Sequence, residues 1–363
     1  MTIKSAFKLF GAYFFRWFSF SIEPTLKKIG NPNQHSPVFI TCNFNLTVKR
    51  VLKSIKDLDC YLLIAPSNGI NVWCGACGGD FMTDSVISII KTSKINELVS
   101  HRTLILPQLS APGIDPVVIK EKVGWNARFG PVYAKDIQNY VKNNLIKTEK
   151  QRNVHFPVSR RLEMANLYFF SLLLLISTFY WIFSIFISYL DLYLYLDSIF
   201  ILILTIFGSL LILPSIKTET GRIKVWIYEI FILTLIIIIS LFLVRNLLYL
   251  IWNIILSILF TFVMAEDFHG LTPIYKSELG EKTWNKGKTK MKVIFGEYRL
   301  QPYGEINIEG EKCVGCKMCI EVCPREVYYF DDKKGKAVLK SPSKCINCHA
   351  CVNRCLAQCL NIV

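Results

Sequence analysis

The sequence predicts a Rossmann-like α/β domain over residues 36–150, a four-helix transmembrane domain over 166–265 and a small cysteine-rich domain over 304–363. Three observations lead to this fold class. Apolar runs alternate with amphipathic stretches in the first part, long apolar runs fill the second, and two cysteine runs of identical spacing occupy the third. A chain of 363 residues has room for two or three such domains.

The α/β domain is predicted from short apolar runs that alternate with helical patterns. The expected elements are strands at 37–42, 60–65, 102–107 and 129–133 and helices at 46–57, 116–122 and 136–145. This alternation favours a mostly parallel sheet. Ligands of such sheets bind beyond the carboxyl ends of the strands. The loops at 66–80 and 107–113 each follow a strand, so we expect both at that edge.

The transmembrane domain is predicted from composition. Hydrophobic residues make up 52% of the chain, and the mean hydropathy is +0.37. The excess is concentrated between residues 166 and 265, and about 20 residues in a helix cross a hydrocarbon core of about 30 Å. The expected spans are 166–190, 196–215, 227–244 and 247–265, followed by a linker at 266–303.

Charges beside these spans predict their orientation. The loop at 191–197 carries Asp191 and Asp197 but no lysine or arginine, so it is expected outside. Basic residues flank the opposite ends of the spans, at positions 160, 161, 217, 222, 224, 276, 282 and 286. Both soluble domains should therefore face the cytoplasm of a cell-membrane protein. Asp197 and Glu229 are interpreted as interfacial residues at span ends, with proton relay as the alternative.

Residues 1–35 are predicted to form an amphipathic segment that lies along the membrane interface. Lysine, arginine and many aromatic residues are mixed in the first 22 positions, and no signal-peptide cleavage site follows. The net charge of +15 indicates attraction to anionic membrane lipid. No nucleic-acid recognition motif accompanies the charge, so nucleic acid is not an expected partner.

The cysteine-rich domain carries two runs of the pattern C-x2-C-x2-C-x3-C. This pattern is typical of bacterial ferredoxins, in which three cysteines bind one [4Fe–4S] cluster and the fourth binds the other. It predicts two clusters, the first held by Cys313, Cys316, Cys319 and Cys355 and the second by Cys345, Cys348, Cys351 and Cys323. A pair of zinc sites is the alternative, but zinc motifs separate their C-x2-C pairs by longer spacers. Cysteines in this pattern indicate a reducing compartment and electron transfer.

A further C-x2-C motif lies in the first loop of the α/β domain, in the stretch Asn71-Val-Trp-Cys74-Gly-Ala-Cys77-Gly-Gly-Asp80. Asn-Val-Trp-Cys before a helix resembles the cap-helix motif of the mercury-methylation corrinoid protein family (HgcA). Similar stretches occur at 99–113, 128–132 and 265–272, and the membrane block is also similar. The C-terminal domain resembles the family's dicluster ferredoxin partner (HgcB), fused here to the same chain. The resemblance covers nearly everything except residues 1–35.

The resemblance implies a bound corrinoid, with Cys74 as a thiolate that ligates cobalt from below. Asn71, Val72, Trp73, Cys77 and His101 are the further cofactor-binding candidates. For Trp73 the alternative is a core aromatic, and for His101 it is a structural hydrogen bond. Cys359 resembles the C-terminal thiol that hands over mercury, which makes it the second catalytic candidate.

The partners implied by the resemblance are a corrinoid or folate methyltransferase as methyl donor, a low-potential electron donor and a soft metal ion such as Hg(II). Transfer of the methyl group as a carbanion equivalent suits such an ion, and the clusters would re-reduce the cobalt.

The chain also departs from the family pattern. Glycine replaces the family's lysine after the cap motif, and Cys359 stands where the family has a pair of cysteines. Gly75, Gly78 and Gly79 each disfavour a helix interior by up to about 1 kcal/mol. Asp80 is expected to cap a helix that starts near Phe81. The corrinoid fold is therefore expected, and the methyl acceptor is left open.

Two other functions compete with a membrane-anchored corrinoid-dependent methyltransferase. The first is a membrane-tethered iron–sulfur electron carrier in which Cys74 and Cys77 form a redox or metal-binding dithiol. The second is a metal-handling protein whose thiols bind a soft ion without catalysis. An axial ligand would make Cys74 alone essential, whereas a dithiol would require both cysteines.

Overall fold

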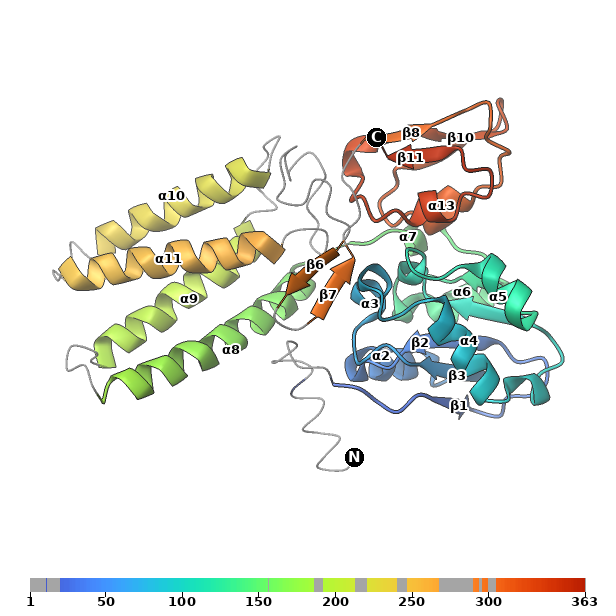
Figure 1. Cartoon of the computed structure of the whole chain (residues 1–363), viewed down its shortest axis with the longest axis horizontal. Coiled ribbons are helices and arrows are strands. Elements are labelled where there is room, and N and C mark those ends of the chain that lie inside the picture. The colour runs from blue at the N-terminus through green and yellow to red at the C-terminus, as the bar shows by residue number, and fades with distance from the viewer. Residues whose placement is uncertain are drawn as a thin grey trace. The chain divides into compact units, whose positions relative to one another are not determined.

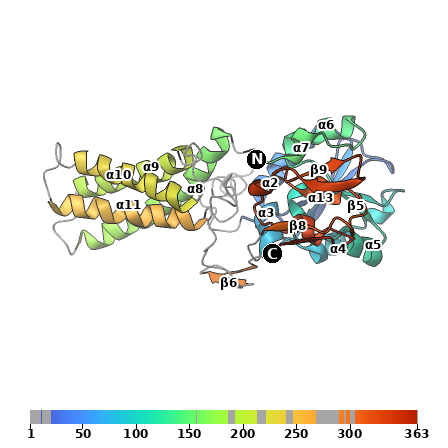
Figure 2. The same cartoon turned by 90° about the horizontal axis from the view of Figure 1, so that it is seen from above.

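The computed structural model divides the chain into two compact units, which are described separately (Figures 1 and 2). It describes residue 11 and residues 20–155, 157–185, 192–212, 221–239, 247–267, 290–293, 296–299 and 305–362. The first unit contains the α/β domain and the cysteine-rich domain, and the second contains residues 155–283. Residues 1–10 and 12–19 of the predicted interfacial segment lie outside the described residues, as do residues 245 and 246 between the last two expected spans.

The α/β domain is built on a five-stranded sheet in the order β1-β3-β2-β4-β5. Its strands are β1 Thr25–Ile29, β2 Val38–Cys42, β3 Cys60–Ala65, β4 Thr103–Leu106 and β5 Asn126–Phe129. The four strands from β2 to β5 are parallel, and β1 pairs antiparallel with β3 at one edge. The predicted parallel sheet is therefore confirmed.

Two predictions at the sheet edges are wrong. Residues 25–29 were assigned to the membrane-interface segment, but they form β1, which pairs with β3 from Thr25 opposite Ile64 to Ile29 opposite Cys60. The last strand was predicted at 129–133, but the observed strand β5 is Asn126–Phe129 and therefore ends where the prediction begins. Pro131 follows two residues later and has no N–H to continue a ladder.

Helices cover both faces of this sheet. The helices are α2 Asn45–Ile55, α3 Val72–Gly78, α4 Thr83–Thr92, α5 Pro116–Val123, α6 Ile137–Lys142 and α7 Glu149–Arg152. Apolar residues of α4 and α5 pack with one face of the sheet, and those of α2 and α6 pack with the other. Cys42 and Cys60 are fully buried in β2 and β3, as expected of small apolar core residues.

The cysteine-rich domain contains β8 Ile306–Ile308, α13 Met318–Val322, β9 Tyr328–Asp331, β10 Lys336–Leu339, α14 Ala350–Asn353 and β11 Leu360–Ile362. β8 pairs antiparallel with β11, which joins the two ends of the domain, and β9 pairs with β10. Its core belongs to the same buried cluster as one face of the α/β sheet. In the linker, β6 Lys290–Val293 and β7 Gly296–Arg299 form an antiparallel pair.

The second unit is a bundle of four helices, α8 Val158–Phe183, α9 Leu192–Ile212, α10 Gly221–Ile239 and α11 Leu247–Asp267, which lie side by side in both views (Figures 1 and 2). By length and composition, α8 and α9 could cross a membrane, and the apolar parts of α10 and α11 are shorter.

Asp197 and Glu229 both lie inside helices of the bundle and not at helix ends, and their position at the membrane interface stays a prediction. α9 begins at Leu192, so Asp197 lies within the helix. Glu229 is 3% exposed in the bundle interior.

Candidate functional site

The Asn71–Cys74 motif forms the start of α3 beyond the carboxyl end of β3. The Asn71 side chain accepts a hydrogen bond of 2.8 Å from the Cys74 N–H and thereby caps the helix. Gly79 ends it in the left-handed conformation, at φ 99°, with its N–H bonded to the Gly75 carbonyl. The expected cap at Asp80 is wrong, because its carboxylate accepts a hydrogen bond from Asn68 and α4 begins only at Thr83.

Two glycines let α3 pack closely against neighbouring backbone. A Cβ on Gly75 would lie 2.9 Å from the Phe81 Cβ, and a Cβ on Gly113 would lie 2.7 Å from the Ala76 carbonyl oxygen. Gly75, which disfavours a helix by propensity, is therefore required by packing. The contact at Gly113 also shows that the loops at 66–80 and 107–113 meet at the same sheet edge, as predicted.

A polar anchor that the sequence analysis missed holds the loop before α3. The buried Asn43 side-chain oxygen accepts hydrogen bonds from the Ser67 N–H at 3.1 Å, the Ser67 hydroxyl at 2.8 Å and the Gly69 N–H at 2.9 Å. Asn43 follows the buried strand β2 directly, and Ser67 lies two residues after the end of the buried strand β3; these positions were the signal available in the sequence. This anchor fixes the direction in which the chain enters α3.

Both thiols of α3 are partly exposed. Val72, Trp73 and Cys74 are each partly exposed, so their side chains are available to a ligand. Burial raises the pKa of the Cys77 thiol to about 12, and the neighbouring Cys74 adds to this shift. Reactive dithiols need a lowered thiol pKa. The arrangement therefore favours Cys74 over the pair as the functional group.

His101 does not join this group. It precedes β4 and so lies at the amino edge of the parallel strands, whereas α3 lies beyond their carboxyl edge. Its Nε2 contacts the Ser36 carbonyl at 2.9 Å, and its Nδ1 accepts the Thr103 N–H at 3.2 Å. These two hydrogen bonds support the structural alternative for His101.

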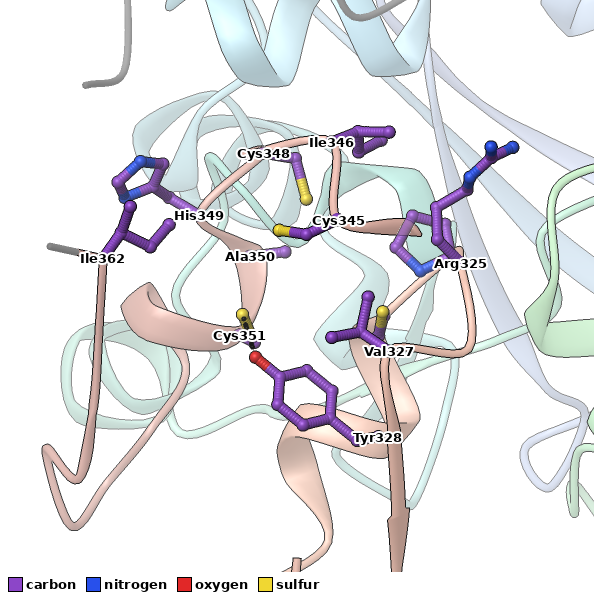
Figure 3. Close-up of a pocket in the computed structure, with 12 residues that line it drawn as sticks. Arg325, Val327, Tyr328, Cys345, Ile346, Cys348, His349, Ala350, Cys351 and Ile362 are labelled. Atoms are coloured by element: carbon purple, nitrogen blue, oxygen red, sulfur yellow. Dashed lines mark hydrogen bonds between the residues drawn. The ribbon is translucent and has the colours of Figure 1, made fainter. Parts of the chain in front are cut away.

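The thiols predicted to hold the second cluster line one pocket in the cysteine-rich domain. Cys323 comes from the first run. Cys345, Cys348 and Cys351 come from the second and are labelled in Figure 3. The buried Tyr328 hydroxyl donates a hydrogen bond of 3.0 Å to the Cys351 sulfur, drawn as a dashed line in Figure 3. Four sulfurs and one hydroxyl donor therefore converge on one apolar site.

The thiols predicted to hold the first cluster are also neighbours. Burial, together with the neighbouring Cys316, Cys313 and Cys355, raises the pKa of Cys319 to about 12. Cys316 is exposed, so this set lies nearer to solvent than the second. Among the described residues, no three His, Cys, Asp or Glu side chains are grouped around a single-ion position.

Cys359 lies beside the first set instead of at the surface. Its side chain is 4% exposed, and its sulfur is 3.4 Å from the Cys355 sulfur. Burial, together with Cys355, raises the pKa of Cys359 to about 12. An exposed thiol that passes on a metal ion is therefore not what the structure shows at this position.

A buried lysine joins the cysteine-rich domain to the α/β domain. The Lys147 ammonium lies 3.1 Å from a Glu321 carboxylate oxygen and donates to the Glu321 carbonyl at 2.8 Å and the Gln108 side-chain oxygen at 3.0 Å. Its side chain is 2% exposed, and burial lowers its pKa to about 8. Arg152 pairs with the other Glu321 oxygen at 3.2 Å.

The 107–113 loop carries a second set of contacts to the cysteine-rich domain. The Asn353 amide in α14 donates to the Pro112 carbonyl at 3.0 Å, and Arg354 forms an ion pair of 2.8 Å with Asp115. The adjacent Gly113 packs against α3. One short loop therefore contacts both the helix that carries Cys74 and the helix that carries Cys351.

Comparison with known proteins finds matches for the α/β domain and for the cysteine-rich domain. Residues 19–141 match the family described as CO dehydrogenase/acetyl-CoA synthase delta subunit, and residues 305–356 match the 4Fe-4S dicluster domain. The acetyl-CoA decarbonylase/synthase complex subunit gamma of Methanocaldococcus jannaschii is 32% identical over 138 residues, which cover 37% of this chain and 28% of that protein. The same subunit of Methanopyrus kandleri is 31% identical over 132 residues, 36% of this chain and 28% of that protein.

The corrinoid/iron-sulfur protein large subunit of Moorella thermoacetica is 28% identical over 126 residues, which cover 34% of this chain and 28% of that protein. The chain thus spans little more than a quarter of the length of these relatives. It contains a domain of the corrinoid/iron–sulfur protein type together with a 4Fe–4S dicluster domain.

Proposed function

We propose that this chain is a membrane-anchored corrinoid-dependent methyltransferase whose fused ferredoxin domain supplies electrons to its own corrinoid. The observation that carries the proposal is Cys74, a partly exposed thiol on a capped helix at the ligand edge of a corrinoid-type α/β domain. The dicluster domain on the same chain supports the electron supply.

The residues present fit both groups. The four cysteines around the apolar pocket are the donor set of a [4Fe–4S] cluster. The other four cysteines, predicted to hold the first cluster, offer the same four sulfur donors. At the ligand edge of the sheet, Asn45 follows β2 with a buried side-chain oxygen that has no hydrogen-bond partner among the described residues. Cys74 provides a thiolate, the type of soft ligand that suits a transition metal.

The chain's own residues would act by positioning and by electron donation. A bound corrinoid supplies a cobalt that accepts and releases a methyl group, and the clusters supply electrons to restore it. Asn71 fixes the backbone amide of Cys74, and the Asn43–Ser67 anchor fixes the preceding loop. Burial keeps Cys77 protonated beside Cys74, so only one of the two thiols serves as a ligand.

The methyl acceptor is proposed to be Hg(II) or a related soft ion, which follows from the resemblance of the Asn71–Cys74 motif. The buried Cys359 does not support delivery of the ion by that thiol. The methyl group would come from a corrinoid or folate methyltransferase, and electrons from a low-potential donor. The apolar helices α8 to α11 support anchoring in the cell membrane, with both soluble domains in the cytoplasm as the flanking charges predict.

The test compares Cys74→Ala with Cys77→Ala in anaerobically purified chain loaded with a corrinoid. Loss of the thiolate ligand should change the visible spectrum of the bound corrinoid in Cys74→Ala and leave it unchanged in Cys77→Ala. Equal effects of both substitutions, with no corrinoid uptake by the wild-type chain, would favour the competing electron carrier with a Cys74/Cys77 dithiol. Iron content, measured in parallel, shows that both variants keep a folded ferredoxin domain.

A further inference from the structure

The two sets of cluster cysteines differ in their exposure. In the first set Cys316 is exposed, and the neighbouring Val314 is 71% exposed. In the second set three of the four cysteines are buried, and they line an apolar pocket. Of the cysteines in the two sets, Cys316 alone is exposed. The first set is therefore the one that offers a ligand to an electron carrier from outside the chain.

The second set is attached to the α/β domain through the segments that carry its cysteines. The Gln108 side chain, which is 1% exposed, donates a hydrogen bond of 3.4 Å to the carbonyl of Cys323. In α14, the helix that carries the last cysteine of this set, the Asn353 amide donates to the Pro112 carbonyl at 3.0 Å. Both partners belong to the loop at 107–113, so two segments of the second set meet one loop.

The same loop packs against the helix that carries Cys74. A Cβ on Gly113 would lie 2.7 Å from the Ala76 carbonyl oxygen, so the loop touches α3 between its two cysteines. Burial raises the pKa of the Cys348 thiol, and Cys77 of α3 is among the neighbouring thiols that add to this shift. α3 therefore neighbours the second set in two ways, through the loop and through Cys77.

The two sets of cysteines also neighbour each other. Burial raises the pKa of the Cys351 thiol, and Cys319 of the first set is among the thiols that add to this shift. The chain crosses between the sets as well, because Cys323 and Cys355 each end one run and are predicted to bind the cluster of the other. An electron that reaches the first set can therefore pass to the second without leaving the domain.

We propose that electrons enter this chain at the first cluster and leave it from the second, across the loop at 107–113 and α3, to the acceptor bound at Cys74. The inference rests on the proposed function, because it needs a redox-active group at Cys74. In each step a reduced cluster loses one electron and its acceptor gains that electron, and no bond breaks. The partner at the entry is a low-potential one-electron carrier protein that contacts the exposed segment at Cys316.

The test removes one cluster at a time from the full chain in detergent without oxygen. Cys316→Ala removes a ligand of the first cluster, and Cys345→Ala removes a ligand of the second. About four iron atoms per chain in each variant show that the other cluster is retained. Uptake is followed with flavodoxin hydroquinone, which becomes the semiquinone when it gives up one electron. Onward transfer is followed by the visible spectrum of hydroxocobalamin added to a chain that has been reduced with dithionite and desalted.

Each variant should lose one step and keep the other. Cys316→Ala should lose uptake from flavodoxin but still pass electrons onward after reduction by dithionite. Cys345→Ala should keep uptake and lose onward transfer. The reverse pattern, or onward transfer that survives in Cys345→Ala, would overturn the proposal. Cobalt content is measured separately. A wild-type chain that binds no cobalt refutes the proposed function and the exit with it, whereas the uptake arm needs no corrinoid and still decides the entry.

A second pair of variants keeps both clusters. Asn353→Ala removes the contact of α14 with the Pro112 carbonyl, and the control Asn361→Ala removes an amide contact of 3.5 Å with Glu309 inside the cysteine-rich domain. Onward transfer should slow by about two- to tenfold in Asn353→Ala, the change in population of a contact that the loss of one hydrogen bond brings. Uptake from flavodoxin should stay unchanged in both variants. Equal onward rates in the two variants would contradict passage across the loop at 107–113.

Discussion

The buried lysine between the two soluble domains gives the stability of the first unit a distinctive pH dependence. Burial lowers the pKa of Lys147 from 10.5 to about 8, even though Glu321 opposes that shift. Below pH 8 the ammonium is charged in both the folded and the unfolded chain. Between pH 8 and 10.5 the unfolded chain binds more protons than the folded chain, so stability rises with pH. At 1.36 kcal/mol per pKa unit, the gain over this window is about 3 kcal/mol.

The assay compares wild type with Lys147→Met by urea unfolding from pH 7 to pH 10.5. Trp125 is fully buried in the α/β domain, and its contribution to the fluorescence of the seven tryptophans, obtained by subtracting a Trp125→Phe chain, reports unfolding there. The free energy of unfolding of wild type minus that of the variant should increase by about 3 kcal/mol across the window. Thiols and tyrosines also titrate in this range, but they are common to both chains and cancel in the difference.

The matched control is Lys340→Met. Lys340 also links the two domains, through an ion pair of 3.6 Å with Glu149, but its side chain is 47% exposed. An exposed pair of this kind contributes little to stability because solvent screens it. The difference between wild type and Lys340→Met should therefore stay flat with pH. Parallel pH profiles for wild type and Lys147→Met would refute the assignment of Lys147 as a buried charge.

Three further substitutions test the sites described. Gly113→Ala should displace α3 and destabilise the fold by about 1–3 kcal/mol in a thermal melt, because the new methyl group would clash with backbone. The control Gly310→Ala, which has nothing within 4 Å of its new methyl group, should leave the melting temperature unchanged. Tyr328→Phe removes the hydrogen bond to the Cys351 sulfur. If that bond stabilises the reduced cluster by about 1.4 kcal/mol, its loss should lower the reduction potential of the second cluster by about 60 mV in a redox titration. His101→Ala should lower the free energy of unfolding by about 1–2 kcal/mol without changing the affinity for a corrinoid, because its ring forms hydrogen bonds with the domain's own backbone. A loss of corrinoid affinity without a loss of stability would contradict the structural role of His101.

Local patterns predicted the parts of the fold that depend on nearby residues. The parallel strands and their helices follow from runs of apolar residues, and the spacing of the cysteines predicted which thiols gather in each set. The Asn71 cap of α3 is also local, because its partner is the amide of Cys74 three residues later.

Contacts between distant residues account for the errors. β1 was assigned to the membrane interface because its pairing with β3 depends on residues more than thirty positions away. Gly75 looked unfavourable in a helix until its contact with Phe81 was known. The hydroxyl partners of Glu229 lie in a later helix, so its burial could not be inferred from the sequence around it. Cys359 was assigned to mercury transfer by resemblance, whereas its burial beside Cys355 accompanies the pairing of β11 with β8.

The most direct test of the proposed function is the metal content of wild-type chain purified without oxygen. The account predicts about one cobalt and about eight iron atoms per chain, the iron in two [4Fe–4S] clusters. The cobalt should remain bound through gel filtration with a visible spectrum that changes in Cys74→Ala. Iron without cobalt, and no uptake of added corrinoid, would contradict the corrinoid assignment and leave a membrane-tethered electron carrier.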